Sequence, residues 1–412
     1  MTTMVENKDK KILNAPHLRF PEFSGEWEEH KLCHIASIVG RIGFRGYTTN
    51  DIVAKGEGAI ALSPTNIENN KLTYDKDNTY ISFYKYEESP EIMIKKGDVI
   101  FVKTGSTVGK VAYVDKLICK TTLNPQAVVL KNIQCNSYLL SVLLSTNRFQ
   151  NAIRKITVGG AVPTLSQGAM GNIAVIMPKV SEQEKLSKFI SLLDERIATQ
   201  SKVIEKLESL IKGLVDELMS VLLKGKLYPF SSFYIKAGEG GTPTTSVVEY
   251  YTEGTIPFIK IEDLSCKYLT NNKDFITELG MQKSSAWLIP SKSVIYSNGA
   301  TIGAISINEY PVCTKQGILG IVPNTNINVE YLYLLMSSSY FSKEINRIIT
   351  EGTMKTAYLK DINHIKCPLP SMAQQKDITN LTSSLEEKLS IEQKYLFSLN
   401  RQKQYLLRQM FI

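Results

Sequence analysis

The sequence predicts an α+β protein, a tandem duplication with pseudo-two-fold symmetry in which two similar mixed α/β domains are separated by two long antiparallel coiled-coil helices. Three observations support this prediction: an internal repeat with a period near 194 residues, short β-rich runs early in each repeat, and a heptad pattern at the end of each repeat. We expect a first domain over 17–179, a central helix over 180–226, a second domain over 227–371 and a C-terminal helix over 372–412.

The internal repeat is clearest where Thr104–Val111 aligns with Asn298–Ile305 at a spacing of 194 residues. Both segments carry the pattern Gly-x-Thr-x-Gly, which predicts a glycine turn between two strands. Further along the chain the spacing settles at 192 residues, where Gln183 aligns with Gln375. Short loop insertions explain this small drift, and a period this long excludes a solenoid.

Each repeat ends in a segment whose apolar residues advance by alternating steps of three and four. The first stripe, interrupted by Gln200, comprises Leu186, Ile190, Leu193, Ile197, Ile204, Leu207, Ile211, Leu214, Leu218 and Val221. The second, shifted by 192 residues, comprises Ile378, Thr382, Leu385, Leu389, Glu392, Leu396, Leu399, Lys403, Leu406 and Met410. Such seams are typical of coiled coils, and two seams in one chain can bury each other. Two alternatives stay open: each helix packs on its own domain, or the helices mediate homodimerisation.

Polar and outward-facing positions of these helices carry two further expectations. Gln200 aligns with Glu392, so the polar break recurs in both seams, and buried polar positions of this kind are best known for setting helix register. A hinge role is the open alternative. The outer face of the second helix is apolar at Ile391, Tyr395 and Tyr405, which predicts a surface for another protein.

Composition narrows the class of protein. The chain has 412 residues, of which 43% are hydrophobic and 21% charged, and no apolar stretch is long enough to span a membrane. The polar, lysine-rich residues 1–16 do not form a signal peptide. The six cysteines are widely spaced, which is typical of reduced thiols in a cytoplasmic protein. A net charge of +8 is compatible with a polyanionic partner.

Catalytic and metal-binding signatures are missing from the sequence. His30 and His34 flank Cys33, but no downstream residues complete a zinc site. Lys110 follows a glycine turn, yet the glycine spacing is one residue short of a phosphate-binding loop and Val111 replaces the required hydroxyl. We therefore expect no catalytic residues, no metal ligands and no enzymatic activity in this chain.

Two related domains joined by a stiff helix pair would suit a partner that itself repeats, and duplex DNA is the commonest such partner. A rod fixes the span between two binding domains, unlike a flexible linker. Because the two halves differ in sequence, they would read different half-sites, which predicts an asymmetric split target.

The sequence resembles the specificity (S) subunits of Type I restriction–modification enzymes over essentially its whole length. The second half carries the resemblance in Gly241–Thr245, Glu249–Tyr251 and Gly254–Ile259. Both halves contribute the Gly-x-Thr-x-Gly turn and a Pro-x-x-x-Glu/Gln-Gln-x-x-Leu/Ile motif that begins each long helix at Pro178 and Pro370. The first half departs from the Gly-x-Thr-Pro pattern, since it has Gly-Arg-Ile-Gly-Phe-Arg-Gly-Tyr-Thr over 40–48.

The resemblance implies two target-recognition domains that each read one half of a bipartite DNA sequence in host defence. It also implies that the helices dock two adenine-N6 methyltransferase (M) subunits, which are joined by restriction (R) subunits for cleavage. S-adenosylmethionine, ATP and magnesium are then expected on these partners, with no cofactor bound by this chain, no membrane association and a cytoplasmic location. The alternative is a non-catalytic protein–protein adaptor with two binding domains on a coiled-coil rod.

Candidate DNA-binding residues combine basic or hydrogen-bonding side chains with loops, because base edges are read by such groups. In the first half they are Arg41, Arg45, Thr48, Lys103 and Ser106. In the second half they are Thr242, Thr244, Thr245, Lys260, Asn298, Lys315 and Gln316. For each of them a solvated surface position or a turn-forming role is the open alternative.

Overall fold

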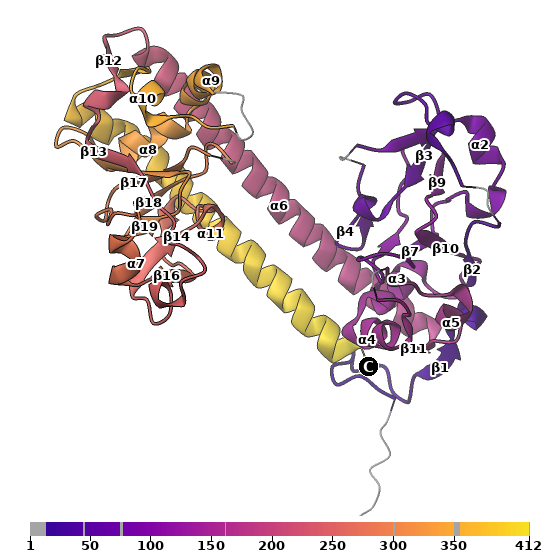
Figure 1. Cartoon of the computed structure of the whole chain (residues 1–412). Coiled ribbons are helices and arrows are strands. Elements are labelled where there is room, and N and C mark those ends of the chain that lie inside the picture. Colours follow the sequence, from indigo (N-terminus) through magenta and orange to yellow (C-terminus); the bar gives the residue numbers. More distant parts are fainter. Residues whose placement is uncertain are drawn as a thin grey trace, which may run out of the picture. The chain divides into compact units, whose positions relative to one another are not determined.

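The computed structural model of the chain describes two compact units (Figure 1). The described residues are 14–43, 46–74, 77–160, 162–299, 301–349 and 355–411. Unit 1 comprises those up to Thr199 together with those from Leu396 on, and unit 2 extends from Gln200 to Tyr395. Each unit therefore contains part of both long helices, α6 (Val180–Leu222) and α11 (Met372–Met410).

Unit 1 is built on a six-stranded sheet. Its strands lie in the order β2 (Ser37–Val39), β10 (Ala127–Lys131), β7 (Val99–Val102), β8 (Val111–Tyr113), β5 (Lys71–Leu72) and β4 (Ile67–Glu68). Two smaller sheets comprise β6 (Thr79–Ile81), β3 (Ala59–Leu62) and β9 (Thr121–Leu123), and β1 (Glu28–Lys31) with β11 (Ala174–Met177). The shorter helices are α1 (Leu32–Ile35), α2 (Phe83–Glu87), α3 (Ser137–Ser145), α4 (Asn147–Ile156) and α5 (Gln167–Gly171).

Unit 2 repeats this arrangement around a five-stranded sheet. Its strands lie in the order β13 (Tyr234–Glu239), β20 (Ile318–Pro323), β17 (Val294–Ser297), β18 (Ile305–Asn308) and β15 (Tyr268–Leu269). The smaller sheets comprise β16 (Asp274–Ile276), β14 (Ile256–Ile259) and β19 (Cys313–Thr314), and β12 (Leu227–Pro229) with β21 (Lys366–Pro368). The shorter helices are α7 (Glu278–Gln282), α8 (Val329–Ser337), α9 (Ser339–Ile348) and α10 (Leu359–Ile362). The predicted α+β fold with two similar domains is confirmed.

Strand β7 shows why the central sheet is covered on both faces. Alternate residues of a strand point to opposite faces, and all of Val99–Val102 are buried. Val99 and Phe101 join the core beneath α3, whereas Ile100 and Val102 join a second core that includes Ile60 and Leu62 of β3. The continuous apolar run Val-Ile-Phe-Val is therefore a strand between two cores.

Helices α6 and α11 pack against each other within each unit and run antiparallel. In unit 1, Leu186 of α6 shares a core with Met410 of α11, and eight residues along α6 Asp194 forms an ion pair with Lys403. In unit 2, Val215 of α6 shares a core with Ile378 of α11. The predicted intramolecular pair is confirmed, and the same cores also include residues of the neighbouring sheets and helices.

The polar break in the seam lies where the sequence places it. Gln200 is 9% exposed, and its Nε2 atom donates to the side-chain Oε2 of Glu392 at 2.6 Å and to the backbone carbonyl of Glu392 at 3.2 Å. The sequence predicts only that the polar break recurs at these two positions, and the structure adds that they contact each other directly. Their role in setting register stays a prediction.

One expectation for the seam is wrong at the C-terminal end of α6. Val221 is 60% exposed, while Val215 and Met219 are buried in the core of unit 2. A straight α-helix drifts by roughly 20° per heptad relative to a strict 3.5-residue repeat. Over about five heptads the drift adds up to roughly 100°, which is the rotation between adjacent residues of an α-helix. The buried stripe therefore moves by one residue, from Leu214 and Leu218 to Val215 and Met219.

A buried glutamine ties the start of α6 to the core of unit 1. Gln183 is 6% exposed and its Nε2 atom donates to the carbonyl of Pro178 at 2.8 Å. Its Oε1 atom accepts from the backbone N–H of Asn136 at 3.0 Å. Because Asn136 is the N-cap of α3, the side-chain amide of Gln183 joins the first turn of α6 to the first turn of α3.

The same connection recurs 192 residues later in unit 2. Gln375 is fully buried, its Nε2 atom donates to the carbonyl of Pro370 at 2.9 Å, and its Oε1 atom accepts from the N–H of Asn328 at 2.7 Å. Asn328 caps α8. The repeated Pro-x-x-x-x-Gln spacing in the sequence is therefore the signature of a repeated structural contact.

Replacing Gln375 with alanine is expected to destabilise unit 2, because the backbone groups of Asn328 and Pro370 lose their partner inside the protein. Each unsatisfied buried group costs about 1–3 kcal/mol. Urea unfolding of the full chain measures the loss, and the Gln393→Ala variant is a matched control because Gln393 is exposed on the same helix. Equal stability of the two variants would contradict the structural role of Gln375.

Candidate nucleic-acid interface

Several strands of unit 2 end at the same side, where the loops that follow β13, β14, β17 and β19 form what we call its loop edge. Strands β13 and β17 both run antiparallel to β20, so their C-terminal ends meet where β20 begins. Strand β14 runs parallel to β19, so its C-terminal end lies beside Thr314 at the end of β19. This pairing brings together loops that are far apart in the sequence.

Backbone contacts hold five of the predicted residues together at this loop edge. The N–H of Gln316 donates to the hydroxyl of Thr242 at 3.4 Å. The N–H of Lys315 donates to the carbonyl of Ile259, the residue before Lys260, at 3.0 Å. The N–H of Asn298 donates to the carbonyl of Gly317, the residue after Gln316, at 3.0 Å.

Glycines allow the β13 loop to pass close to its neighbours. A Cβ atom on Gly240 would lie 2.0 Å from the carbonyl oxygen of Thr314, and a Cβ atom on Gly241 would lie 2.3 Å from the hydroxyl of Ser285. No side chain fits at either position. The Gly-Gly pair that precedes Thr242 is thus required by packing, and this packing places the threonine beside Gln316.

The predicted residues of unit 2 differ in how far they are available to a ligand. Thr244, Thr245, Lys315 and Gln316 are exposed. Lys260 is half-buried and lies 2.9 Å from Asp274, whose hydrogen bond raises the pKa of the lysine. Their contact with a ligand stays a prediction.

Asn298 has a structural role in this fold. It is 1% exposed and its Nδ2 atom donates to the carbonyl of Ala357 at 3.1 Å. The N–H of Ala357 in turn donates to the carbonyl of Asn298 at 2.9 Å. Asn298 therefore corresponds to the turn-forming alternative, because its side chain holds two loops together from inside.

Unit 1 has a matching loop edge, formed by the loops that follow β2, β3, β7 and β9. Arg41 follows β2, and its Nη2 atom donates to the carbonyl of Leu123 at 2.8 Å while Nη1 reaches the hydroxyl of Ser89 at 3.4 Å. Burial lowers the pKa of this half-buried arginine. These contacts attach the β2 loop to the end of β9.

The other first-half candidates fall into different places. Lys103 is half-buried and Ser106 is exposed, both on the turn after β7 at the loop edge. Thr48 caps a short helical turn, where its N–H and hydroxyl donate to Asp51 at 2.7 and 3.0 Å. Arg45 lies outside the described residues. Arg41, Lys103 and Ser106 therefore share the loop edge of unit 1.

The structure adds a turn that the sequence did not single out, Asn124–Gln126. The carbonyl of Gln126 accepts from the N–H groups of Lys103 and Thr104 at 2.8 and 3.2 Å. The side chain of Asn124 accepts from the N–H of Gln126 at 2.8 Å and donates to Gln126 Oε1 at 3.2 Å. The exposed amide of Gln126 is thus held in place at the loop edge of unit 1.

Gln126 and Gly317 lie at equivalent places in the two units, because each directly precedes β10 or β20 and its carbonyl accepts from the turn after β7 or β17. Gln316 lies one residue earlier, at the place of Pro125. The sequence signal for Gln126 is its place shortly after β9, the strand that corresponds to β19 in the second repeat. The glycine turns alone do not point to it. The weak similarity of Thr121–Leu123 to Cys313–Thr314 made this signal faint.

Lys110 confirms the interpretation of its glycine motif as a strand connection. The turn joins β7 to β8, and the lysine Nζ atom donates to the carbonyls of Ile67 and Pro64 at 3.2 and 3.4 Å.

Within the described ranges, no three or more His, Cys, Asp or Glu side chains gather as a metal site would require. Over the same part of the chain, no helix combines the length and apolarity needed to span a bilayer. All six cysteines are free.

A known protein family matches the chain twice, once in each half. The sequence model of the Type I restriction modification DNA specificity domain matches residues 25–209 and again residues 233–401. The chain belongs to this family. The predicted resemblance to specificity subunits is therefore confirmed in both halves.

Relatives in this family are distant in sequence. The putative MjaX specificity subunit of Methanocaldococcus jannaschii is 22% identical over 90% of this chain and 90% of its own length. The HindI specificity subunit of Haemophilus influenzae is 22% identical over 80% of this chain and 86% of its own. The MjaIX specificity subunit of M. jannaschii is 27% identical but aligns over 38% of this chain and 36% of its own.

Solved structures share the fold of the family. The S subunit of a Type I restriction–modification system from M. genitalium has a TM-score of 0.54 at 17% identity, and the match covers 97% of this chain and 99% of that one. A chain from a structural study of assembly and conformational transition in a Type I system has a TM-score of 0.55 at 16% identity, covering 93% and 97%.

Proposed function

We propose that this chain is the DNA-sequence-recognition subunit of a Type I restriction–modification complex, which reads a bipartite asymmetric target with one domain per half-site. The observation that carries this proposal is the family match in both halves of the chain. The loop edges support it, because the same backbone frame presents Lys103, Ser106 and Gln126 in unit 1 but Thr242, Lys315 and Gln316 in unit 2. Different side chains on one frame read different bases.

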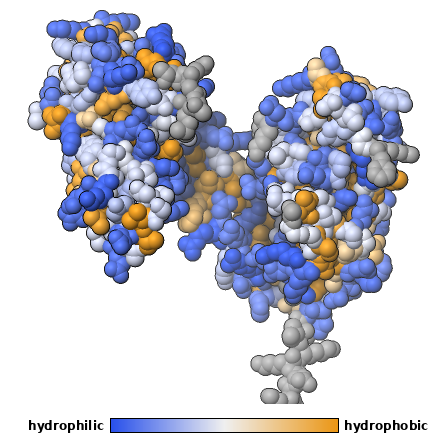
Figure 2. Space-filling model, in the orientation of Figure 1, coloured by the Kyte–Doolittle hydropathy of each residue, from blue (hydrophilic) through white to orange (hydrophobic). Residues whose placement is uncertain are grey.

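The partners in this proposal are double-stranded DNA, two M subunits and the R subunits. Large apolar side chains exposed on the long helices support protein docking there, as does the hydrophobic surface of these helices in Figure 2. These side chains include Leu192, Leu210, Ile391, Tyr395, Phe397 and Tyr405. The sequence expectation for Ile391, Tyr395 and Tyr405 as exposed residues is confirmed.

Catalysis belongs to the partners in this proposal. The chain itself would bind no cofactor, while S-adenosylmethionine serves adenine-N6 methylation on the M subunits and ATP and magnesium serve the R subunits. The assembly would act in the cytoplasm, where its DNA target lies. The helix pair would keep the two recognition domains at a set span, and that span would define the spacer between the half-sites.

Binding of duplex DNA by the chain together with its M partner is expected to weaken steeply with salt. If about six phosphates are contacted, affinity falls by roughly 10³-fold between 50 and 200 mM salt, since condensed counterions are released on binding. Fluorescence anisotropy of a labelled duplex measures the slope. A protein–protein adaptor would instead show no salt-dependent DNA binding.

Exchange of residues 17–179 for those of a relative is expected to change one half of the methylated sequence and leave the other half intact. The physical reason is that each unit carries its own sheets and core. Genome-wide mapping of methylated adenines in cells that co-express the M partner reads both half-sites at once. A change in both halves would contradict modular recognition.

Replacing Gln126 with alanine is expected to relax one base position of the first half-site, because a glutamine amide can bind the N6 and N7 edge of adenine in a bidentate manner. Loss of one such contact corresponds to about 1–3 kcal/mol of discrimination. Adenine-methylation mapping of the variant measures the change. The Gln316→Ala variant is the matched control and should alter only the other half-site; an unchanged motif in the Gln126 variant contradicts the assignment.

A further inference from the structure

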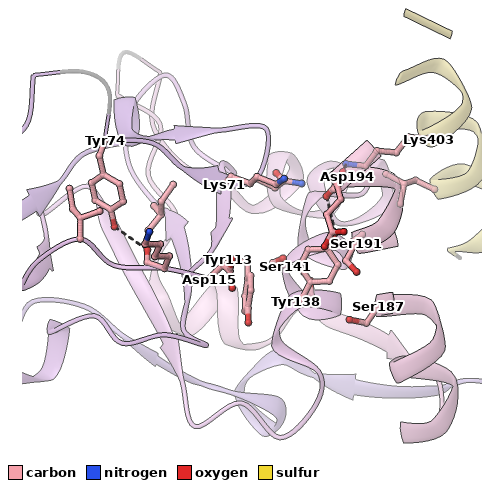
Figure 3. A pocket seen from close by; sticks show the side chains of 17 residues that line it. Lys71, Tyr74, Tyr113, Asp115, Tyr138, Ser141, Ser187, Ser191, Asp194 and Lys403 are labelled. Carbon is pink, nitrogen blue, oxygen red and sulfur yellow. Dashed lines mark hydrogen bonds and ion pairs between the residues drawn. The ribbon is translucent and has the colours of Figure 1, made fainter. Parts of the chain in front are cut away.

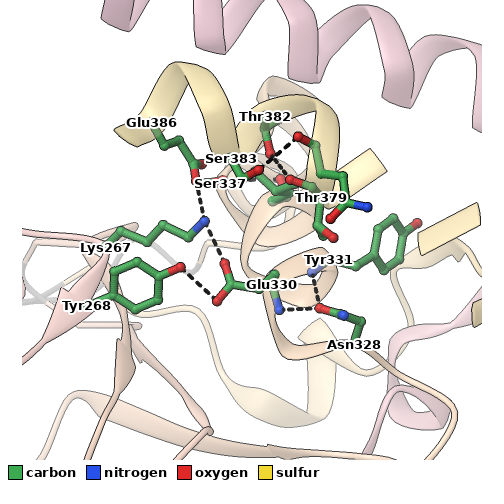
Figure 4. A network of polar contacts seen from close by, with 12 residues as sticks. Lys267, Tyr268, Asn328, Glu330, Tyr331, Ser337, Thr379, Thr382, Ser383 and Glu386 are labelled. Atoms are coloured by element: carbon green, nitrogen blue, oxygen red, sulfur yellow. Dashed lines mark hydrogen bonds and ion pairs between the residues drawn. The ribbon is translucent and has the colours of Figure 1, made fainter. Parts of the chain in front are cut away.

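In unit 2, Lys267 joins the five-stranded sheet to the short helix α8 and to the long helix α11 (Figure 4). The Nζ atom of Lys267 lies 2.6 Å from Glu330 of α8 and 2.5 Å from Glu386 of α11. Only 14% of the lysine side chain is exposed. Since Lys267 directly precedes β15, the edge strand of the five-stranded sheet, this contact attaches the outer edge of the sheet to α11.

The surroundings of Lys267 favour its charged form and a single orientation. Burial by itself lowers the pKa of the lysine, but the hydrogen bonds and charges of Glu330 and Glu386 outweigh burial and raise it. The ring centroids of Tyr268 and Tyr333 each lie 5.3 Å from the ammonium group. The hydroxyl of Tyr268 also donates to Glu330 at 3.0 Å. The cation is therefore held between two carboxylates and two aromatic rings.

The repeat allows the same place to be found in unit 1. At a spacing of 192 residues, Tyr138 of α3 corresponds to Glu330, and Asp194 of α6 corresponds to Glu386. The hydroxyl of Tyr138 donates to Asp194 at 2.8 Å, and Asp194 forms an ion pair with Lys403 of α11. In unit 1 the carboxylate thus joins α3 to the two long helices without involving the edge of the sheet.

In unit 1, strand β5 and the turn that joins it to the edge strand β4 instead border a cavity of about 530 Å³ (Figure 3). Lys71 of β5 pairs with β8 as Tyr268 of β15 pairs with β18, so Asn70 corresponds to Lys267. Ser141 lines the cavity at the position where unit 2 has Tyr333. Smaller residues at these positions leave the space that Lys267 and its aromatic neighbours occupy in unit 2.

Backbone conformation explains why unit 1 does not form the same contact. Asn69 and Asn70 have φ values of 49° and 62°, which is the two-residue hairpin turn that joins β4 to β5. Asparagine tolerates this left-handed conformation, whereas unit 2 has no strand corresponding to β4 in its five-stranded sheet. Among the described residues, neither Asn70 nor Lys71 forms a side-chain hydrogen bond or ion pair with α3, α6 or α11.

We propose that Lys267 is a positioning residue that fixes the second recognition domain on helix α11, whereas the first domain is joined to the long helices without such a contact at the edge of its sheet. The consequence for DNA rests on the proposed function. A fixed sheet presents its loop edge in one orientation, so binding of the second half-site requires no prior ordering. Loss of Lys267 would then weaken DNA binding rather than slow the chemistry on the partner subunit.

The decisive variant combines Lys267→Met with Glu386→Gln, so that position 386 carries no unpaired charge, while Glu330 loses its cation but keeps its hydrogen bond from Tyr268. In the complex with the M partner, we expect KM for target DNA to rise about tenfold, within the range for coupled buried contacts, with kcat nearly unchanged. Hydrogen exchange of the full chain should show faster exchange in β15 and the adjoining part of β18.

Two further variants separate positioning from mere destabilisation. Lys267→Arg keeps the charge between both carboxylates and should restore KM. Lys292→Met removes an exposed ion pair with Glu309 in the same unit and should change neither KM nor exchange in β15. A variant that loses active protein would lower the apparent kcat at constant KM, and that result would overturn the positioning role.

The proposal also fails if the double variant matches Lys292→Met in hydrogen exchange or if KM stays unchanged. These outcomes leave the proposed function intact, because the unaltered chain would still direct methylation to a bipartite sequence. Absence of sequence-directed methylation with the unaltered chain would instead contradict the proposed function, while the exchange experiment would still report on the contact itself.

Discussion

The structure depends on how the apolar stripes of α6 and α11 are buried. Within each unit these stripes are shared between the partner helix and the core beneath the central sheet, as Leu186 with Met410 and Val215 with Ile378 show. A helix of this length has a longer apolar stripe than the partner helix alone or the domain core alone can cover. The buried amides of Gln183 and Gln375 then give each helix a defined starting point on its domain, because they satisfy backbone groups that would otherwise be buried without partners.

Duplication of this frame leaves the loop edges and the outer sheet edges free to differ. Strand pairing determines where the loops after β7 and β17 begin and end, but it does not restrict which side chains occupy the tips of these loops. The same holds for the outer edge of each sheet, where Lys267 in one unit corresponds to a tight asparagine turn in the other. A protein built this way can change what one half recognises while it keeps the contacts that hold the helices.

Long periodic features were predictable from the sequence, whereas single side chains were not. The seams, the glycine turn at Lys110 and the pair Gln200–Glu392 follow from patterns that repeat along the chain. The sequence predicts Arg41 and Asn298 as DNA-contacting residues, but it does not show that Arg41 also binds the end of β9 or that Asn298 is buried between two loops. The place of Gln126 is not readable from the sequence, because the residues that hold its backbone, Lys103 and Thr104, belong to the distant turn after β7.

The sequence by itself determined the duplication, the mixed α/β content of each half and the apolar seams of the two helices, because these depend on periodicity and on local backbone preference. Tertiary structure decided which loops meet at one edge, which polar residues are buried and which lysine reaches two carboxylates at once. Such facts depend on long-range strand pairing and on the slow rotation of a straight helix against its heptad pattern, and neither is encoded in any short stretch of residues.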